Sequence, residues 1–254
     1  MIIELFGPPT VGKTTFARAL AAQFMRQGRP VQLMLSLRPT ERAVPGDDSA
    51  SRPHRWSAVR RVVRPTFELV SCVGQMRRGA TEASLAAQLL EVLPLSSVAW
   101  SVRMSQYIKR LEHSWRLARQ TDVAVIFDQG FVQCVCSLVL LSPLAPPHSI
   151  EKVMALIPKA DQWISIAAPA ALLRARLHAR RARQSWLENR FELDVPTSLR
   201  SIEILSMLES MLQRYGPCVI RVAAGAEGVS DAIRIDGPCG VPAGTEGLGR
   251  QPMP

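Results

Sequence analysis

The 254-residue chain lacks an apolar run long enough to cross a membrane, which takes about 18 uninterrupted apolar residues. Its most apolar stretch, residues 135–141, is short and is followed by Pro143. At the amino terminus Glu4 and Gly7 interrupt the apolar residues, and there is no basic region or cleavage site of a signal peptide. We therefore predict a cytoplasmic protein with no membrane partner.

Cysteine is also scarce and irregularly placed. The five cysteines are odd in number, and Cys134 and Cys136 form a lone CxC with no partner ligands at zinc-like spacing. This usage indicates buried free thiols in a reducing compartment rather than a disulfide framework.

Lysine accounts for only four of the 31 basic residues, so the net charge of +10 is carried by arginine. Arginine enrichment alone does not indicate a function, but its placement does. Residues 38–64 hold seven arginines against three acidic residues, and residues 174–190 hold six against one. Two basic segments in an otherwise balanced chain suggest an anionic ligand held between them.

With 47% hydrophobic residues, the chain can build one large core. The pattern predicts an α/β fold, in which a five-stranded parallel sheet is flanked by helices. Apolar positions from Trp100 to Ala118 recur at helical spacing, and we interpret them as core packing rather than a base-stacking surface. The expected strands are 1–6, 31–37, 123–127, 162–167 and 218–223, and the expected helices include 13–27, 169–183 and 198–215.

One domain, residues 1–235, accounts for all of these elements. Residues 38–64 are expected to form a basic loop within this domain, because prolines and a glycine lie among the arginines. From residue 236 onward nine of 19 residues are Gly or Pro, so we expect a disordered tail over 236–254.

The strongest motif lies between the first expected strand and helix and matches GxxxxGK[ST] without a mismatch. The glycines allow backbone N–H groups to surround phosphates, and the amino end of the helix adds its positive dipole. Lys13 can reach the β- and γ-phosphates, and the Thr14 hydroxyl can bind Mg²⁺. A glycine turn that happens to precede a lysine is the alternative, which the flanking strand and helix disfavour. The predicted nucleotide-binding residues are Gly7, Pro8, Pro9, Thr10, Val11, Gly12, Lys13, Thr14 and Thr15.

Asp128 directly follows an apolar strand, at the edge of the sheet where the phosphate loop begins. There it can hold Mg²⁺ through water or accept a proton from a hydroxyl group. Alternatively, it caps the helix that starts near Phe131, and the two roles are compatible.

The arginines of residues 174–190 form the third candidate element. Arg176, Arg180 and Arg183 fall on one helix face, and guanidinium groups suit the charge of a transferring phosphoryl group. A solvated arginine-rich helix face is the alternative.

With these residues the chain resembles the thymidylate kinase-like branch of the P-loop kinases over about residues 1–235. The phosphate loop matches, Arg38 resembles the arginine that meets the acceptor, and Asp128 resembles the first residue of an Asp-Arg-Tyr motif. The arginine-rich region of about residues 174–195 resembles the family's lid. The resemblance implies the P-loop NTPase fold, ATP as donor, Mg²⁺, and a lid that excludes water.

The chain departs from the family at Gln129 and Gly130, where the motif has Arg and Tyr. Gln129 can exchange hydrogen bonds with an acceptor but cannot neutralise a phosphate. A nucleoside, sugar or other hydroxyl metabolite is therefore at least as good an acceptor as a monophosphate.

The leading hypothesis is thus a Mg-ATP-dependent kinase with Lys13, Asp128, Arg176, Arg180 and Arg183 as catalytic residues. Thr14 and Asp128 would bind the metal, and Arg38 and Gln129 would bind the acceptor. A nucleotide-dependent switch or ATPase that acts on a partner protein through residues 38–64 is the alternative. Nucleic-acid binding is disfavoured, because few aromatic residues lie among the arginines and no recognised module is present. The sequence does not determine the acceptor or the oligomeric state, and a homodimer is one possible assembly.

Overall fold

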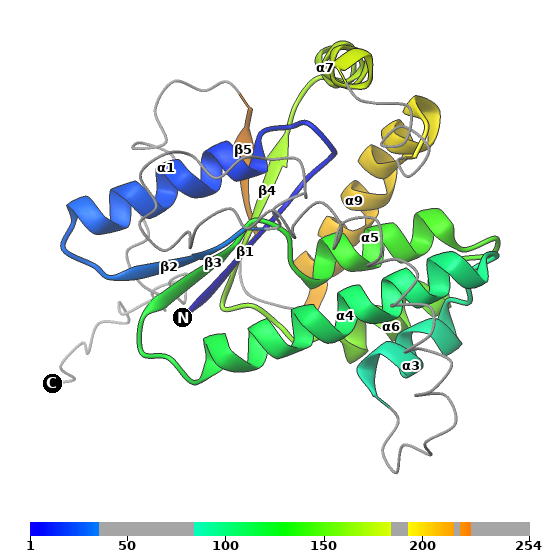
Figure 1. Ribbon diagram of the computed structural model, residues 1–254, viewed down its shortest axis with the longest axis horizontal. Coiled ribbons are helices and arrows are strands. Elements are labelled where there is room, and N and C mark those ends of the chain that lie inside the picture. The colour runs from blue at the N-terminus through cyan, green and yellow to red at the C-terminus, as the bar shows by residue number, and fades with distance from the viewer. Residues whose placement is uncertain (36–83, 184–192, 216–218, 225–254) are drawn as a thin grey trace, which may run out of the picture.

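A parallel five-stranded sheet forms the centre of the molecule (Figure 1). The computed structural model describes residues 1–35, 84–183, 193–215 and 219–224. All strand pairs are parallel, and the order in the sheet is β2-β3-β1-β4-β5. The α/β fold expected from the sequence is thereby confirmed. The strands are β1 (Ile2–Phe6), β2 (Val31–Met34), β3 (Ala124–Phe127), β4 (Gln162–Ala167) and β5 (Val219–Ala223).

Helices cover both faces of the sheet, as a parallel sheet requires. The helices with predicted bounds begin and end within a few residues of them, whereas the sequence pattern gave no separate prediction for α3 or α6. The basic loop of residues 38–64, residues 184–192 of the predicted lid and the tail lie outside the described residues. The helices are α1 (Lys13–Arg26), α3 (Leu85–Val92), α4 (Val98–Arg119), α5 (Phe131–Leu141), α6 (Pro147–Leu156), α7 (Ala170–Arg183) and α9 (Val195–Tyr215).

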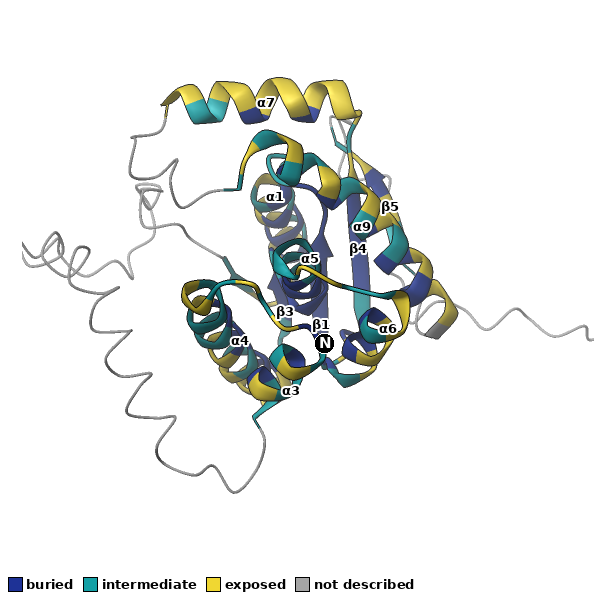
Figure 2. Ribbon diagram, turned by 90° about the vertical axis from the view of Figure 1, so that its right-hand side faces the viewer, coloured by how far each residue is buried: buried dark blue, intermediate teal, exposed yellow. Residues whose placement is uncertain are grey.

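The strand residues alternate between two buried clusters, one on each face. On β1, Ile3 and Leu5 pack with α1, whereas Ile2 and Phe6 pack with α3, α4, α5 and α9. Figure 2 shows the strands buried inside the molecule, with α7 lying across one end and exposed along most of its length. Glu4 shares the face of Ile2 and Phe6 because side chains alternate along a strand.

The apolar stripe of α4 is part of the core, as predicted. Met104, Ile108, Leu111 and Trp115 are buried, and the Trp115 ring centroid lies 4.8 Å from that of Phe127. Burial of each such side chain stabilises the fold by about 1.5–3 kcal/mol. In the part of the chain that the structure describes, no helix is both long and apolar enough to span a membrane.

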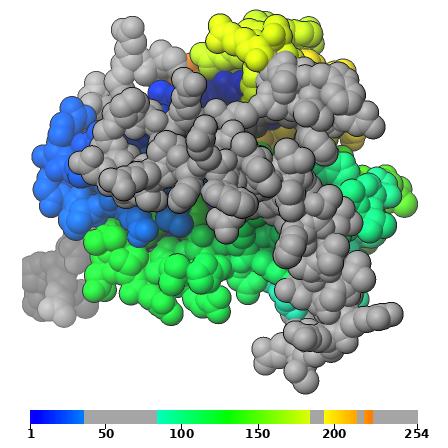
Figure 3. Space-filling view, in the orientation of Figure 1, coloured from blue at the N-terminus to red at the C-terminus, as the bar shows by residue number. Residues whose placement is uncertain are grey.

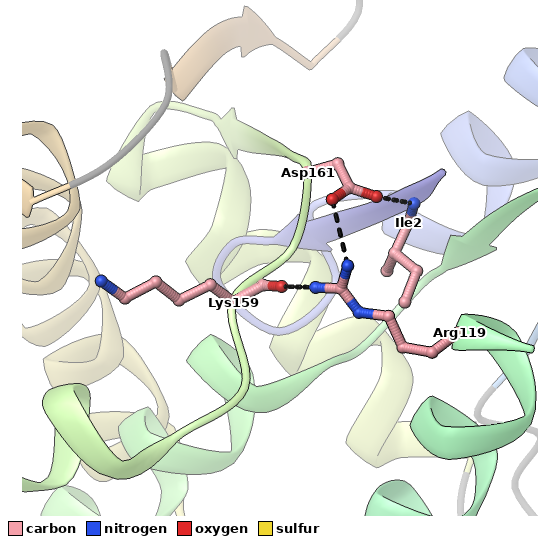
Figure 4. A network of polar contacts seen from close by, with 4 residues as sticks. All are labelled: Ile2, Arg119, Lys159 and Asp161. Atoms are coloured by element: carbon pink, nitrogen blue, oxygen red, sulfur yellow. Dashed lines mark hydrogen bonds and ion pairs between the residues drawn. The ribbon is translucent and has the colours of Figure 1, made fainter.

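A network of polar contacts lies at the amino ends of β1 and β4, at the edge of the sheet opposite the phosphate loop (Figure 4). Asp161 accepts hydrogen bonds from the Ile2 amide at 2.6 Å and from Arg119 Nη1 at 3.3 Å. Arg119 also donates to the Lys159 carbonyl. The end of α4 and the turn before β4 are thus held to the first residue of β1.

The two cysteines of α5 are free and buried, as expected. Burial raises the pKa of Cys136 to about 12 and that of Cys134 further still. Both are therefore neutral thiols and poor nucleophiles. The other three cysteines lie outside the described residues.

Candidate phosphate-binding site

The phosphate loop connects β1, the central strand of the sheet, to α1. Two of its residues adopt left-handed backbone conformations, with φ of 64° at Thr10 and 106° at Gly12. Gly12 is the N-cap residue of α1, and no side chain caps this helix end. The first amides of α1 are therefore available to an anion, and the helix dipole favours negative charge there.

The side chain of Lys13 folds back over the phosphate loop that precedes it. Its Nζ donates hydrogen bonds to the Gly7 carbonyl at 2.6 Å and to the Pro8 carbonyl at 3.0 Å. The residue is only 8% exposed. Its ammonium group thus lies against the backbone of the predicted phosphate-binding loop.

Thr14 and Asp128 meet next to this loop. Thr14 Oγ1 donates to Asp128 Oδ2 at 2.9 Å, although the two residues are 114 positions apart in the sequence. Asp128 is buried at the end of β3, and its amide donates to the Met34 carbonyl of β2 at 3.2 Å. Strands β1 and β3 are neighbours in the sheet, which is why the two side chains converge.

The alternative role of Asp128 as a helix cap is wrong. The N-cap residue of α5 is Gly130, without a side-chain cap. The carboxyl oxygen that accepts from the first turn of α5 belongs instead to Glu4, whose Oε1 lies 2.6 Å from the Val132 amide nitrogen. The Asp128 carboxylate accepts the hydrogen bond from Thr14 Oγ1.

A hydroxyl and a carboxylate side by side are suitable ligands for Mg²⁺, which prefers oxygen and is commonly held by one or two protein groups together with substrate phosphates. No group of three or more His, Cys, Asp or Glu side chains in the described residues could hold a metal ion. The hydroxyl of Thr14 and the carboxylate of Asp128 fit a magnesium ion shared with a nucleotide.

Helix α7 brings one of the predicted lid arginines to the loop. Arg176 Nη1 lies 3.3 Å from the Thr10 carbonyl and 3.4 Å from the Val11 carbonyl. Leu173 and Leu177 are the buried residues of this helix. In the space-filling view α7 lies at the top of the face, with α1 to its left and α4 along the lower edge (Figure 3).

The remaining predicted residues differ in placement. Arg180 is half-buried, Arg183 is exposed at the end of α7, and Gln129 is half-buried next to Asp128. Arg38 lies outside the described residues. Of the three arginines predicted to be catalytic, Arg176 contacts the phosphate loop.

Two residues of this site were missed in the sequence. The Gly7 amide donates to Gln133 Oε1 at 3.4 Å, and Glu4 holds the first turn of α5. Gln133 could have been found as a polar residue in the first turn after Asp128. Glu4 could have been found as the one charged residue in a buried central strand.

Burial raises the pKa of Glu4 to about 8, against the opposing effect of the hydrogen bond from the Val132 amide. Burial also raises the pKa of Tyr107 on α4, with smaller contributions from Cys134, Glu4 and Asp128.

A cavity of about 210 Å³ opens on the β4 side of the loop. Its lining includes Gly7 and Pro8, the end of β4, one side of α9, and Arg221 of β5. The Glu209 carboxylate accepts from Ser165 Oγ at 3.0 Å and from Arg221 Nε at 2.9 Å. The cavity and Asp128 thus lie on opposite flanks of β1.

The sheet order and the GxxxxGKT loop after the central strand define the P-loop NTPase fold. No family model and no curated protein matches the chain. Among solved structures, the deoxyadenosine kinase of M. mycoides with the products dCMP and a flexible dCDP aligns at a TM-score of 0.48 and 11% identity, over 88% of this chain and 91% of that one. The same kinase with dCTP aligns at 0.43 and 12%, over 88% and 90%. With dATP it aligns at 0.46 and 10%, over 88% and 91%.

Proposed function

We propose that the protein is a Mg-ATP-dependent kinase that transfers the γ-phosphoryl group to a hydroxyl of a small molecule. The observation that carries the proposal is the hydrogen bond between Thr14 and Asp128, next to a phosphate loop crossed by Lys13. These groups supply a hydroxyl, a carboxylate and an ammonium where a nucleotide's β- and γ-phosphates would lie.

Each residue has a role that follows from its charge and position. Lys13 and Arg176 stabilise the negative charge of the transferring phosphoryl group. Thr14 and Asp128 would hold Mg²⁺, which would neutralise part of the phosphate charge. The acceptor oxygen forms its bond to the γ-phosphorus as the bond to the bridging oxygen breaks, ADP leaves, and the hydroxyl proton passes to water. The protein contributes mainly positioning and charge stabilisation.

Gln129 supports a neutral acceptor. It is the half-buried residue of the turn after β3, between the buried Asp128 and the side-chain-free Gly130. An amide exchanges hydrogen bonds with hydroxyl or base groups but provides no positive charge for a phosphate. We therefore propose a nucleoside, a sugar or a similar hydroxyl metabolite as acceptor, with Arg38 as a further contact on the basis of the resemblance. The cytoplasmic location and a homodimer stay predictions.

The test is ADP release from Mg-ATP across nucleosides, nucleoside monophosphates, sugars and amino-alcohols. Lys13→Ala should abolish acceptor-dependent release, whereas Lys109→Ala, an exposed lysine of α4, should leave it unchanged. Release that does not depend on any acceptor, or ATP binding without release, would contradict the kinase and favour a nucleotide-dependent switch.

A further inference from the structure

Gly130, the third residue of the turn after β3, has no conformational need to be glycine. Its φ of −121° and ψ of −148° describe extended backbone that other residues also adopt. Space is the constraint instead, because a Cβ at this position would overlap the Glu4 side chain and come within 2.6 Å of Oε1. The turn therefore has room for the Glu4 carboxyl group only because residue 130 has no side chain.

Glu4 lies at the middle of the sheet, in register with Phe127 of β3 and Trp163 of β4. It is fully buried, and its Oε1 accepts from the Val132 amide at 2.6 Å. That amide is in the first turn of a helix, where no carbonyl of the same helix can accept from it. One carboxyl group thus joins β1 to the start of α5.

A second contact joins the same elements three residues further along the chain. The Gly7 amide, at the start of the phosphate loop, donates to Gln133 Oε1 in the first turn of α5. The beginning of α5 is therefore held by both the strand and the loop. Asp128, three residues before α5, is held in addition by Thr14.

We propose that Glu4 is a positioning residue, size-matched to Gly130, that fixes the turn of Asp128 and Gln129 against the phosphate loop. This inference rests on the proposed function, in which the same turn binds metal and acceptor. Without the Glu4 carboxyl group, the first turn of α5 loses its acceptor and the turn before it can shift relative to Lys13 and Thr14. The phosphate loop itself, built on β1 and α1, still binds nucleotide.

The first test separates positioning from nucleotide binding. Glu4→Asp is too short to reach Val132, whereas Glu4→Gln keeps an oxygen of the right reach. We expect Glu4→Asp to lower kcat by about 10- to 100-fold, because misplacing catalytic groups by about 1 Å has an effect of this size in other enzymes. ATP affinity, measured by equilibrium dialysis with a labelled nucleotide, should change less than about threefold, and Glu4→Gln should restore most of kcat. Glu151→Asp on the exposed face of α6 is the matched control.

The second test is a double-mutant cycle on the size-matched pair. Gly130→Ala alone should lower kcat because its methyl group displaces the carboxyl group. In the Glu4→Ala background the same methyl group has room, so its additional effect should be smaller than in the wild type. The proposal would be overturned if Gly130→Ala lowered kcat by the same factor in the Glu4→Ala background as in the wild type. Equal losses of kcat in Glu4→Asp and Glu4→Gln would also overturn it.

Hydrogen exchange distinguishes failure of this inference from failure of the proposed function. If the wild-type protein phosphorylates no acceptor, the kinase proposal fails while the contact can still be tested. The Val132 amide should then exchange faster in Glu4→Asp than in the wild type and Glu4→Gln, with ATP affinity retained. Unchanged exchange at Val132 in Glu4→Asp would overturn the inference, whatever the enzymatic result.

Discussion

Thr14 Oγ1 donates a 2.9 Å hydrogen bond to Asp128 Oδ2, which joins the first turn of α1 to the end of β3. The contact brings a hydroxyl group from the phosphate-loop motif to the carboxylate of the neighbouring strand. The two residues are the oxygen donors that a magnesium ion shared with a nucleotide would use.

The first prediction concerns the charge of Asp128. Asp128→Asn keeps an oxygen that can accept from Thr14 but removes the negative charge, so phosphoryl transfer should fall by about 100-fold or more. Thr14→Ser should keep substantial activity, and Thr14→Val should lose it. Initial rates over a Mg²⁺ titration provide the measurement, and full activity in Asp128→Asn would remove Asp128 from the mechanism.

The second prediction concerns Arg176, which lies 3.3 Å from the Thr10 carbonyl. Arg176→Ala should lower kcat by at least about 10-fold, because arginines that face a transferring phosphoryl group contribute up to roughly 10³–10⁵ in other enzymes. Arg174→Ala, an exposed position on the same helix, is the control. Equal rates in the two variants would indicate that the basic face of α7 only contacts solvent.

The third prediction is a pH dependence of stability caused by Glu4. Its native pKa of about 8 exceeds the ordinary value of 4.5, so the native state binds the proton more tightly than the unfolded state. The resulting stabilisation is complete below pH 4.5, decreases as the pH rises, and is lost above about pH 8. Glu4→Gln stays neutral and should gain stability relative to the wild type over this range, by at most roughly 5 kcal/mol.

Urea unfolding at pH 5, 7 and 9 measures this difference, with Glu151→Gln as the exposed control. If the unfolding free energies of the wild type and Glu4→Gln differed by the same amount at all three pH values, Glu4 would not have the raised pKa, and this prediction would be wrong.

The fourth prediction compares two arginines in ion pairs. The side chains of Arg119 and Asp161 are 48% and 41% exposed, so Arg119→Ala should cost at most about 1 kcal/mol of unfolding free energy. Arg221 pairs with Glu209, whose side chain is only 6% exposed, and Arg221→Ala should cost about 1–3 kcal/mol because it leaves a buried carboxylate short of a donor. Urea unfolding at neutral pH decides between them, and a larger loss in Arg119→Ala would contradict this order.

Periodicity was sufficient to predict the sheet and most of its helices. The apolar residues of 123–127 mark a central strand because both faces of a parallel strand are covered, and the stripe of α4 marks a helix that packs on the core. The position of Asp128 at a strand end was predicted as well. The alternative, in which Asp128 is the N-cap residue of α5, was wrong, because Gly130 holds that position and Glu4 accepts from the Val132 amide.

The sequence by itself determined the strands, the helices and the phosphate-loop motif, because these depend on residues close together in the chain. Tertiary structure alone decided which side chains meet around that loop. Glu4 contacts Val132 across 128 positions, Gly7 contacts Gln133 across 126, and Arg176 contacts Thr10 across 166. Such pairs follow from strand order and helix packing, which bring distant segments to one edge of the sheet and leave no periodic signal in the sequence.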